Sequence, residues 1–543
     1  MIKLKQFIHK NKNILLLIIL LIISFTRMYN LGCLEIQPWD EAMYAIRAKA
    51  AALNNQWFDQ TDYSVGGLYS SSHPPIFIWL TALGFKIFGV SSFSVRLWSS
   101  LMGIGILIFL FFIPSRRKAG FLAALILATN AFFNSYTRQG QLDIAYIFFI
   151  VAGLWFWIKF EKTDQKKYLL VTGFIFGLAL MSKIIVGLFF IISLTLYKLL
   201  KFIYKQTDLK NCFIHLLVIF SVGLLTALPW HLFMLIKYGN SFVNFFLFFH
   251  LFERTLTGVE SNTQSLGYFF YINQIIILMP VITVLIIYYW KLIFPPRKNK
   301  MLLYFCFFIV PFIIFSLSQT KLRTYSLVML PFMSLLGGEL LLVMWSQKKI
   351  HTLIPLFALL FIFWSQFPQF RYQLKYLSSN WLHQVIAVDI LWLCLTAAII
   401  VFNRKMDGKK WVLTFLSITV LTSFTSETRL YYQGNLKFAS ELFFQHNYNT
   451  LIYVDNQNSI TNPQINYYFN GIDRGLTGNE YTFIRIYPSA SANSSLPELE
   501  PGCMIIFNQW HYLEDFKAIE NYYRSNYKLD IIVNNEFYRI YKI

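Results

Sequence analysis

Thirteen apolar runs of about 17–25 residues divide the chain, and their lengths constrain its fold more than any other feature. A bilayer core about 30 Å thick needs about 20 residues of helix to cross it. The runs therefore predict a polytopic α-helical membrane protein with about thirteen spans. They lie near residues 13–30, 93–113, 119–135, 144–160, 168–182, 184–200, 211–236, 266–290, 301–317, 326–345, 350–367, 383–402 and 411–425.

The distribution of basic residues predicts the orientation of these spans. Only 13% of the 543 residues are charged, against about 25% in soluble proteins, yet the formal net charge is +21. A basic surface for nucleic acid is one explanation, but the basic residues form short clusters between apolar runs, as the positive-inside rule describes. One orientation, with the N-terminus inside, places all six clusters inside. They are Arg116–Lys118, Lys166–Lys167, Lys198–Lys210, Arg297–Lys300, Lys348–Lys349 and Arg404–Lys410.

The composition changes after Phe424, where long apolar runs stop and Asn and Tyr become frequent. Strands are predicted at 451–454 and 504–507, a helix at 512–527, and a hairpin at 529–533 and 537–541. We predict a transmembrane domain over 1–428, with a first outer loop at 31–92, and a small α/β domain over 429–543. An odd number of spans puts that domain outside. Cys33 and Cys503 then lie on the same side, and whether they pair is left open.

The first outer loop carries the polar stretch Pro38–Pro75, with adjacent acids at Asp40 and Glu41. If residues 39–52 are helical, Asp40, Tyr44 and Arg47 share one face at i, i+4 and i+7. A carboxylate, a phenol and a guanidinium on one face indicate a polar site. The alternative is an interfacial amphipathic helix with solvated charges. The short apolar helix predicted at Ile76–Phe88 fits the interface better than a full span.

Ionisable residues recur in every outer loop of this topology, and at membrane depth such groups are costly. Carboxylates and cations together suit an anionic substrate and a group that removes a proton. Single members have simpler explanations: Asp143 as a helix cap, Lys183 as a snorkelling side chain, and His250 with Glu253 as surface residues. The set comprises Asp40, Glu41, Arg47, Asp59, Asp62, His73, Arg138, Asp143, Lys183, His250, Glu253, Arg254, Lys321, Arg323 and Tyr325.

Soluble nucleotide chemistry has no support in the sequence, which lacks a P-loop, a dinucleotide fingerprint, HExxH and GxSxG. His250 and Glu253 have an i, i+3 spacing that suits a metal, but two ligands are too few to predict a site. No cofactor is required, and a divalent metal is unsupported. A substrate delivered from within the bilayer is the more natural expectation.

Seven stretches, in order, resemble bacterial GT-C glycosyltransferases of the protein-mannosyltransferase-like superfamily, which includes the aminoarabinose transferases of lipid A. They cover roughly residues 14–345. They are WDEAMYA (39–45), HPPIFIWLTALGFKIFG (73–89) with SSFSVRLWSSLMG (91–103), FLAALILATNAFFNSYTRQGQLD (121–143), LALMSKIIVGL (178–188), ALPWHLFML (227–235), FFHLFERT (248–255) and SLSQTKLRTYSLVMLP (316–331).

The resemblance implies a GT-C fold in the bacterial inner membrane, with a cytoplasmic N-terminus and a periplasmic α/β domain. It implies transfer of a sugar from a polyprenyl-phosphate donor, with inversion, to a lipid, glycan or protein acceptor. Asp40 matches the general base, and Asp143 matches the acid of the second outer loop. Lys183, Lys321 and Tyr325 also match positions of the family pattern, and the cations are expected to hold the lipid phosphate. The further candidates for substrate binding are Glu41, Tyr44, Arg47, His73, Arg138, His250, Glu253 and Arg254.

The chain departs from the aminoarabinose transferases at Ser72-His73, where they have a Glu-Lys pair. The sugar and the acceptor are therefore left open. Two rival functions remain beside the transferase: a transporter or flippase of a lipid-linked sugar, and a membrane scaffold for the outer domain. A transporter would more often place its ionisable groups at the midplane within a repeat. Neither feature is evident in the sequence.

Overall fold

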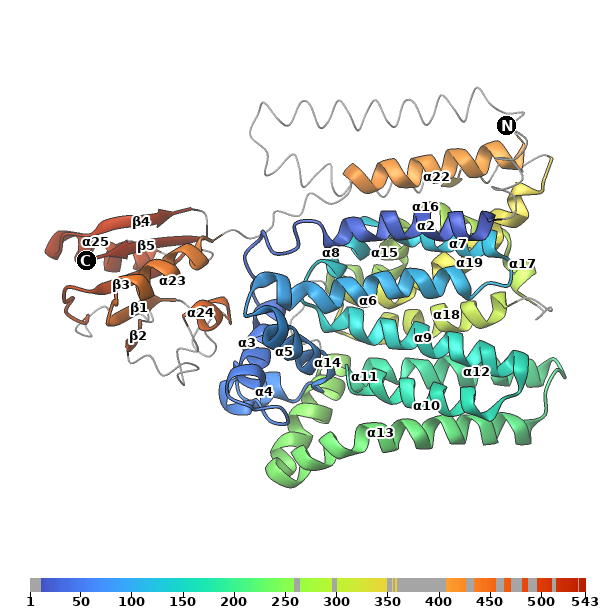
Figure 1. Ribbon diagram of the computed structural model, residues 1–543, viewed down its shortest axis with the longest axis horizontal. Coiled ribbons are helices and arrows are strands. Elements are labelled where there is room, and N and C mark those ends of the chain that lie inside the picture. Colours follow the sequence, from blue (N-terminus) through green and yellow to red (C-terminus); the bar gives the residue numbers. More distant parts are fainter. Residues whose placement is uncertain are drawn as a thin grey trace. The chain divides into compact units, whose positions relative to one another are not determined.

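The computed structural model describes most of the chain (Figure 1). The described residues are 11–257, 264–294, 300–348, 354, 357–358, 407–425, 434–455, 463–469, 481–486, 496–509, 514–535 and 537–543. The predicted spans near 350–367 and 383–402 lie almost wholly outside them.

The chain forms two compact units. The first contains Met1–Tyr29, Ser99–Arg138 and Leu142–Thr428, and the second contains Asn30–Trp98, Gln139–Gln141 and Arg429–Ile543. The second unit thus combines the first outer loop with the C-terminal region. The predicted division into domains 1–428 and 429–543 stays a prediction.

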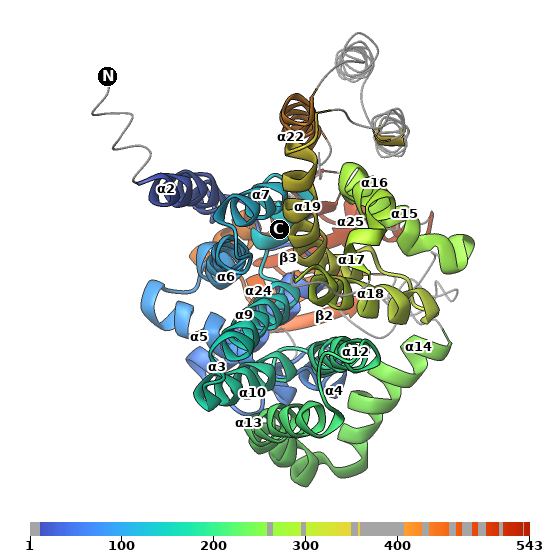
Figure 2. The same cartoon turned by 90° about the vertical axis from the view of Figure 1, so that its right-hand side faces the viewer.

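The first unit is a bundle of helices that Figure 2 shows nearly end-on. Most predicted spans coincide with one helix or with two consecutive helices. The elements are α2 (Lys12–Phe25), η1 (Thr26–Met28), α6 (Ser92–Phe112), α7 (Arg117–Ala128), α8 (Ala131–Thr137), α9 (Leu142–Thr163), α10 (Lys166–Leu180), α11 (Ile184–Gly187), α12 (Phe189–Ile203), α13 (Leu209–Val243), η3 (Asn244–Glu253), α14 (Arg254–Leu256), η4 (Gln264–Phe269), α15 (Phe270–Leu278), α16 (Pro280–Tyr288), α17 (Trp290–Ile293), α18 (Met301–Leu317), η5 (Arg323–Met329), α19 (Leu330–Trp345) and α22 (Gly408–Thr425).

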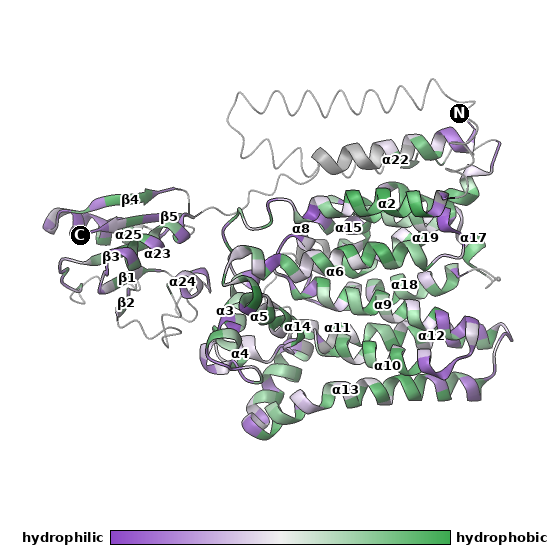
Figure 3. Cartoon of the chain, in the orientation of Figure 1, coloured by the Kyte–Doolittle hydropathy of each residue, from purple (hydrophilic) through white to green (hydrophobic). Residues whose placement is uncertain are grey.

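The bundle confirms the predicted class of α-helical membrane protein. Among the described residues, four helices are long and apolar enough to cross a membrane, or up to six if each of two bent pairs is one span. The pairs bend by 74° between α7 and α8 and by 109° before α16. The count of thirteen stays a prediction. Figure 3 shows apolar residues along the helices and hydrophilic residues where α12 leads into α13.

Small residues set the closest helix packing in the bundle. A Cβ atom added at Gly223 of α13 would lie 2.2 Å from the Phe176 ring of α10. One added at Gly177 of α10 would lie 2.4 Å from Thr226. Glycine therefore lets the backbones of α10 and α13 approach, as is common between helices in membranes.

The C-terminal part of the second unit contains a five-stranded sheet in the order β2-β1-β3-β5-β4. The first three strands are parallel, and β5 pairs antiparallel with β3 and β4. The predicted strands, helix and hairpin are confirmed, whereas β2, α23 and α24 were not predicted. The elements are α23 (Leu436–Gln445), β1 (Thr450–Val454), α24 (Pro463–Tyr468), β2 (Thr482–Ile486), β3 (Cys503–Asn508), α25 (Glu514–Asn526), β4 (Asp530–Asn534) and β5 (Tyr538–Lys542).

Alternating side chains of the strands bury both faces of this sheet. Leu451 and Tyr453 of β1 pack with α23 and α24, in a cluster that includes Phe443. Ile452 and Val454 pack on the other face with Phe516 of α25. The predicted small α/β domain is therefore confirmed as a sheet between two helical layers. The thiols of Cys33 and Cys503 are both free, the first exposed and the second buried.

The first outer loop folds into α3 (Asp40–Leu53), η2 (Thr61–Tyr63), α4 (Leu68–Ser71) and α5 (Ile76–Phe88). The predicted helices at 39–52 and 76–88 are confirmed. Helix α3 packs against both α5 and α24. Alanine fills the contacting face, with Ala45, Ala48 and Ala52 buried. Small side chains let α3 lie between two neighbours.

Candidate active site

Asp40 is the first residue of α3, and its side chain is exposed. The preceding residue, Trp39, has φ 63° and ψ −113°. Similar angles occur at Gly67, Gly239 and Gly267. A bulky residue in this glycine-type region stores about 1–3 kcal/mol of strain. The chain thus enters α3 through a strained residue that orients an exposed carboxylate.

Glu41, the next residue, is completely buried in an ion pair with Arg96. Its Oε1 lies 2.8 Å from Nε and its Oε2 lies 2.9 Å from Nη2 of Arg96. The backbone N–H groups of Gln37 and Gly140 also donate to this carboxylate, at 2.6 and 2.7 Å. The alternative of a solvated charge is therefore wrong for Glu41. Its contacts hold the loop that precedes α3.

Arg47 lies in the interior of the first outer loop and is completely buried. It donates to the carbonyl groups of Ser70 and His73, at 3.0 and 2.9 Å, and to Gln60 Oε1 at 3.2 Å. Burial lowers the pKa of Arg47 to about 10, so the guanidinium stays charged at neutral pH. Tyr44 is also buried, with its ring 6.2 Å from that of Phe77. Arg47 therefore fixes the turn that carries His73.

A second group of predicted residues meets in the first unit. Asp143, near the start of α9, is buried and pairs with Lys183 across 3.3 Å. The Lys183 ammonium lies 5.9 Å from the ring centre of Tyr146 and 5.5 Å from that of Tyr325. Asp143 lies inside α9 and not before its start, so the structure gives it an ion pair with Lys183 and not the expected role as a helix cap. The sequence placed these residues in three loops, and the fold brings them together.

Lys321 extends this group along the same end of the bundle. Its ammonium donates to the carbonyl groups of Phe315 and Ser316, at 3.0 and 2.6 Å, and also to that of Ser318. The last carbonyl groups of a helix have no N–H donor within the helix, and Lys321 caps the end of α18 by donating to them. The ring of Phe315 stacks on Tyr325 with centres 4.5 Å apart. An aromatic contact thus links Lys321 to the pair of Asp143 and Lys183.

The remaining predicted residues have other surroundings. Arg138 donates to the carbonyl groups of Arg27 and Thr26, at 2.8 and 3.3 Å, beyond the end of α2. His250 and Glu253 lie in η3, the first half-buried and the second exposed, and Arg254 begins α14.

Arg96 is the important residue that sequence reasoning missed. Besides binding Glu41, it donates to the carbonyl groups of Leu31, Leu34 and Glu35, at 3.1, 2.9 and 2.6 Å. The available signal was an arginine beside a long apolar run, where an unpaired charge is costly. Such a charge requires a partner, and Glu41 was the partner to be sought.

Among the residues that the structure describes, no group of three or more His, Cys, Asp or Glu side chains is placed to hold a metal ion. Whether the protein uses a divalent metal stays open to experiment.

Comparison with known proteins identifies the fold. Residues 72–233 match the sequence family described as dolichyl-phosphate-mannose-protein mannosyltransferase. ArnT from Cupriavidus metallidurans, solved with undecaprenyl phosphate, matches 97% of this chain and 97% of its own, with a TM-score of 0.67 and 14% identity. The chain therefore has the fold of ArnT. This confirms the predicted resemblance and the predicted fold class.

Other comparisons give a structural match with a lower TM-score and sequence matches over part of the chain. The oligosaccharyltransferase AglB of Archaeoglobus fulgidus, solved with an inhibitory peptide and a dolichol-phosphate, has a TM-score of 0.50 and 12% identity, over 86% of this chain and 64% of its own. Two uncharacterized proteins of Aquifex aeolicus (strain VF5) are 30% identical over 175 residues and 29% identical over 194 residues. These matches span 32% and 42% of the relatives' lengths, and 32% and 35% of this chain.

Proposed function

We propose that the protein is an integral-membrane glycosyltransferase that uses a polyprenyl-phosphate-linked sugar. The observation that carries this proposal is the match to ArnT along 97% of both chains. ArnT was solved with undecaprenyl phosphate, the lipid part of such a donor. The basic clusters favour the bacterial inner membrane with the N-terminus in the cytoplasm. The reaction then takes place at the periplasmic side.

The proposed reaction is a single displacement at the anomeric carbon. The acceptor hydroxyl gives its proton to Asp40 and forms a new bond from its oxygen to that carbon. The bond from the anomeric carbon to the phosphate oxygen breaks, and polyprenyl phosphate leaves with the electron pair. One attack from the opposite face inverts the configuration. An exposed carboxylate on a strained helix start suits the task of accepting a proton.

The leaving phosphate needs cations, and the first unit supplies them. Lys183 keeps about 18% of its side chain exposed while it pairs with Asp143. An arriving phosphate oxygen would compete with that carboxylate for the ammonium, and Tyr325 adds a hydroxyl donor. Lys321 supports the loop beside it. We propose that Lys183 and Tyr325 contact the phosphate and that Asp143 holds Lys183 in place.

Replacement of Asp40 by Asn tests the proton acceptor. The purified protein in nanodiscs is incubated with the total lipid extract of bacterial membranes, and mass spectrometry follows conversion of polyprenyl-phosphate sugars to polyprenyl phosphate. Asp40→Asn should lower turnover by about 10²- to 10⁴-fold, which general base catalysis typically contributes. Asp62→Asn, an exposed acid of the same loop, is the matched control and should keep full turnover.

Two results would contradict this assignment. Turnover by Asp40→Asn at the wild-type rate would show that Asp40 is not the general base. Movement of the intact lipid-linked sugar across the bilayer without cleavage would favour the rival transporter. A separate measurement, thermal stabilisation by undecaprenyl phosphate, should be kept by Asp40→Asn and weakened about tenfold or more in apparent affinity by Lys183→Met.

A further inference from the structure

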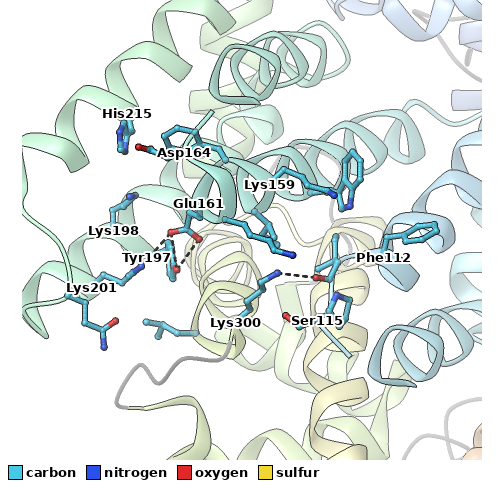
Figure 4. A pocket seen from close by; sticks show the side chains of 18 of the residues that line it. Phe112, Ser115, Lys159, Glu161, Asp164, Tyr197, Lys198, Lys201, His215 and Lys300 are labelled. Atoms are coloured by element: carbon cyan, nitrogen blue, oxygen red, sulfur yellow. Dashed lines mark hydrogen bonds and ion pairs between the residues drawn. The ribbon is translucent and has the colours of Figure 1, made fainter. Parts of the chain in front are cut away.

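A cavity of about 1000 Å³ opens in the first unit at the end of α9 away from Asp143 (Figure 4). Helix α9 contributes both Asp143 and Glu161, which lies on the cavity wall. The two residues are 18 positions apart, or about 27 Å along the helix. The ends of α6, α9 and α12 and the start of α18 surround the cavity. Neither the proposed transfer reaction nor its donor uses this cavity.

Positive charge dominates the cavity wall. Six basic side chains line it, against two acidic ones. Glu161 is already engaged, since Lys201 lies 3.5 Å away and the Tyr197 hydroxyl donates to both of its oxygens at 3.3 Å. Among the described residues, Lys201 is the lining cation that has a carboxylate within ion-pair distance. The six basic residues are Arg117, Lys159, Lys162, Lys198, Lys201 and Lys300.

Two of these lysines are held away from water. Lys198 is 6% exposed, and its ammonium lies 4.8 Å from the ring centre of Trp157. Lys300, just before α18, donates to the Ile113 carbonyl at 3.3 Å, and burial lowers its pKa to about 8. A partly desolvated ammonium gains more from an anion than a solvated one does. The cavity therefore presents cations that an anionic group would stabilise.

Apolar side chains also line the cavity, with Phe112, Trp155 and Ile158 among them. Phe112 is 37% exposed at the very end of α6, where a membrane helix meets the headgroup region. Lysines beside exposed apolar side chains at helix ends match an amphiphile better than a soluble anion. We propose that this cavity binds the phosphate-bearing headgroup of an anionic membrane lipid. In the predicted orientation the site faces the cytoplasmic leaflet.

Short-chain lipids test the proposal on the purified full chain in detergent. Thermal unfolding is followed while dioctanoyl phosphatidic acid, dioctanoyl phosphatidylcholine or inorganic phosphate is added at constant ionic strength. We expect saturable stabilisation by phosphatidic acid, and little by phosphatidylcholine or inorganic phosphate. The double variant Lys198→Met and Lys300→Met should weaken the apparent affinity at least tenfold. Lys210→Met, an exposed lysine outside the cavity, is the matched control.

Three results would overturn the proposal. Equal stabilisation by inorganic phosphate would make the site one for a free anion. An unchanged response in the double variant would place the lipid elsewhere. A response lost in Lys183→Met instead would assign it to the proposed donor site, which separates the two proposals. If gel filtration shows that the double variant misfolds, Lys159→Met replaces it as the test. Lys159 is half-buried, and its replacement should weaken lipid binding severalfold. An unchanged affinity in Lys159→Met would also contradict the proposal.

Discussion

Asp40 and Glu41 are adjacent acids with opposite surroundings, because successive residues of a helix point about 100° apart. Asp40 faces outward at the start of α3, and Glu41 faces inward onto Arg96. The buried ion pair and its hydrogen bonds to the Gln37 N–H group and the Leu31 carbonyl hold the loop before α3. One acid is thereby available for chemistry while its neighbour fixes the structure.

Replacement of Glu41 by Gln should destabilise the second unit by about 3–5 kcal/mol, since it leaves the Arg96 guanidinium buried without its counter-charge. Thermal and denaturant unfolding of the purified protein measure this. Asp62→Asn is the surface control and should stay within about 0.5 kcal/mol. The double variant Glu41→Gln with Arg96→Met should lose less than the sum of the single variants. Strict additivity would show that the pair is not coupled.

Replacement of Trp39 by Gly should relieve backbone strain, whereas Trp39→Ala should keep it, because both lack the indole and differ only in the Cβ atom. The Gly variant should be more stable than the Ala variant by about 1 kcal/mol or more. Unfolding midpoints of the two purified variants provide the measurement. Equal stability, or a more stable Ala variant, would mean that residue 39 is not held in the glycine-type conformation.

At the scale of elements, α3 is held between α5 and α24, and Lys49 makes the contact with α24. The Lys49 ammonium donates to the Tyr467 carbonyl at 2.7 Å and lies 4.5 Å from the centre of that ring. It is 6% exposed, and burial lowers its pKa to about 8 from an ordinary value of 10.5. A hydrogen bond and a ring contact thus hold a charge that burial disfavours.

The stability of the contact between α3 and α24 should rise with pH between about 8 and 10.5. In that interval the unfolded chain binds the Lys49 proton and the folded chain does not, so each increase in pH favours the folded state, by on the order of 3 kcal/mol in total. Below pH 8 the contribution is constant. Denaturant unfolding at pH 7.5 and 9.5 should show about 2 kcal/mol of this gain in the wild type relative to Lys49→Met. An identical pH response in both would refute the assignment.

In the molecule as a whole, contacts within the second unit join residues more than 400 positions apart in sequence. The Glu35 carboxylate accepts from the backbone N–H of Lys437 at 2.9 Å, at the start of α23. The Ile36 backbone N–H donates to the Tyr468 hydroxyl at 2.9 Å. The loop that carries Asp40 is therefore supported by the C-terminal sheet and its helices.

Removal of residues 429–543 should expose the first outer loop to proteolysis, because α3 then loses its contact with α24 and Glu35 loses its donors. Limited trypsin digestion in nanodiscs should cleave between residues 30 and 98 in the truncated protein, while the full chain resists cleavage there. Cleavage at Lys166-Lys167, at the start of α10, is the internal control and should not change. Equal protection of the loop would refute this supporting role.

The sequence by itself determined the elements whose signals are local. Long apolar runs require helices because a bilayer leaves no other partner for the backbone, and alternating strands and turns marked the C-terminal sheet. The helix that begins at Asp40 was only assumed in the sequence argument, and the structure contains it. The weaker elements β2, α23 and α24 were not, because their short segments carry no distinct periodicity and depend on packing for stability.

Only the tertiary structure decided the partners of the charged residues. Glu41 with Arg96, and Asp143 with Lys183, are separated by 55 and 40 residues in sequence. The energy of each pair depends on distance and burial, neither of which is a property of a single segment. The sequence specified which charges the protein must accommodate; the fold decided which of them are buried supports and that Asp40 is exposed.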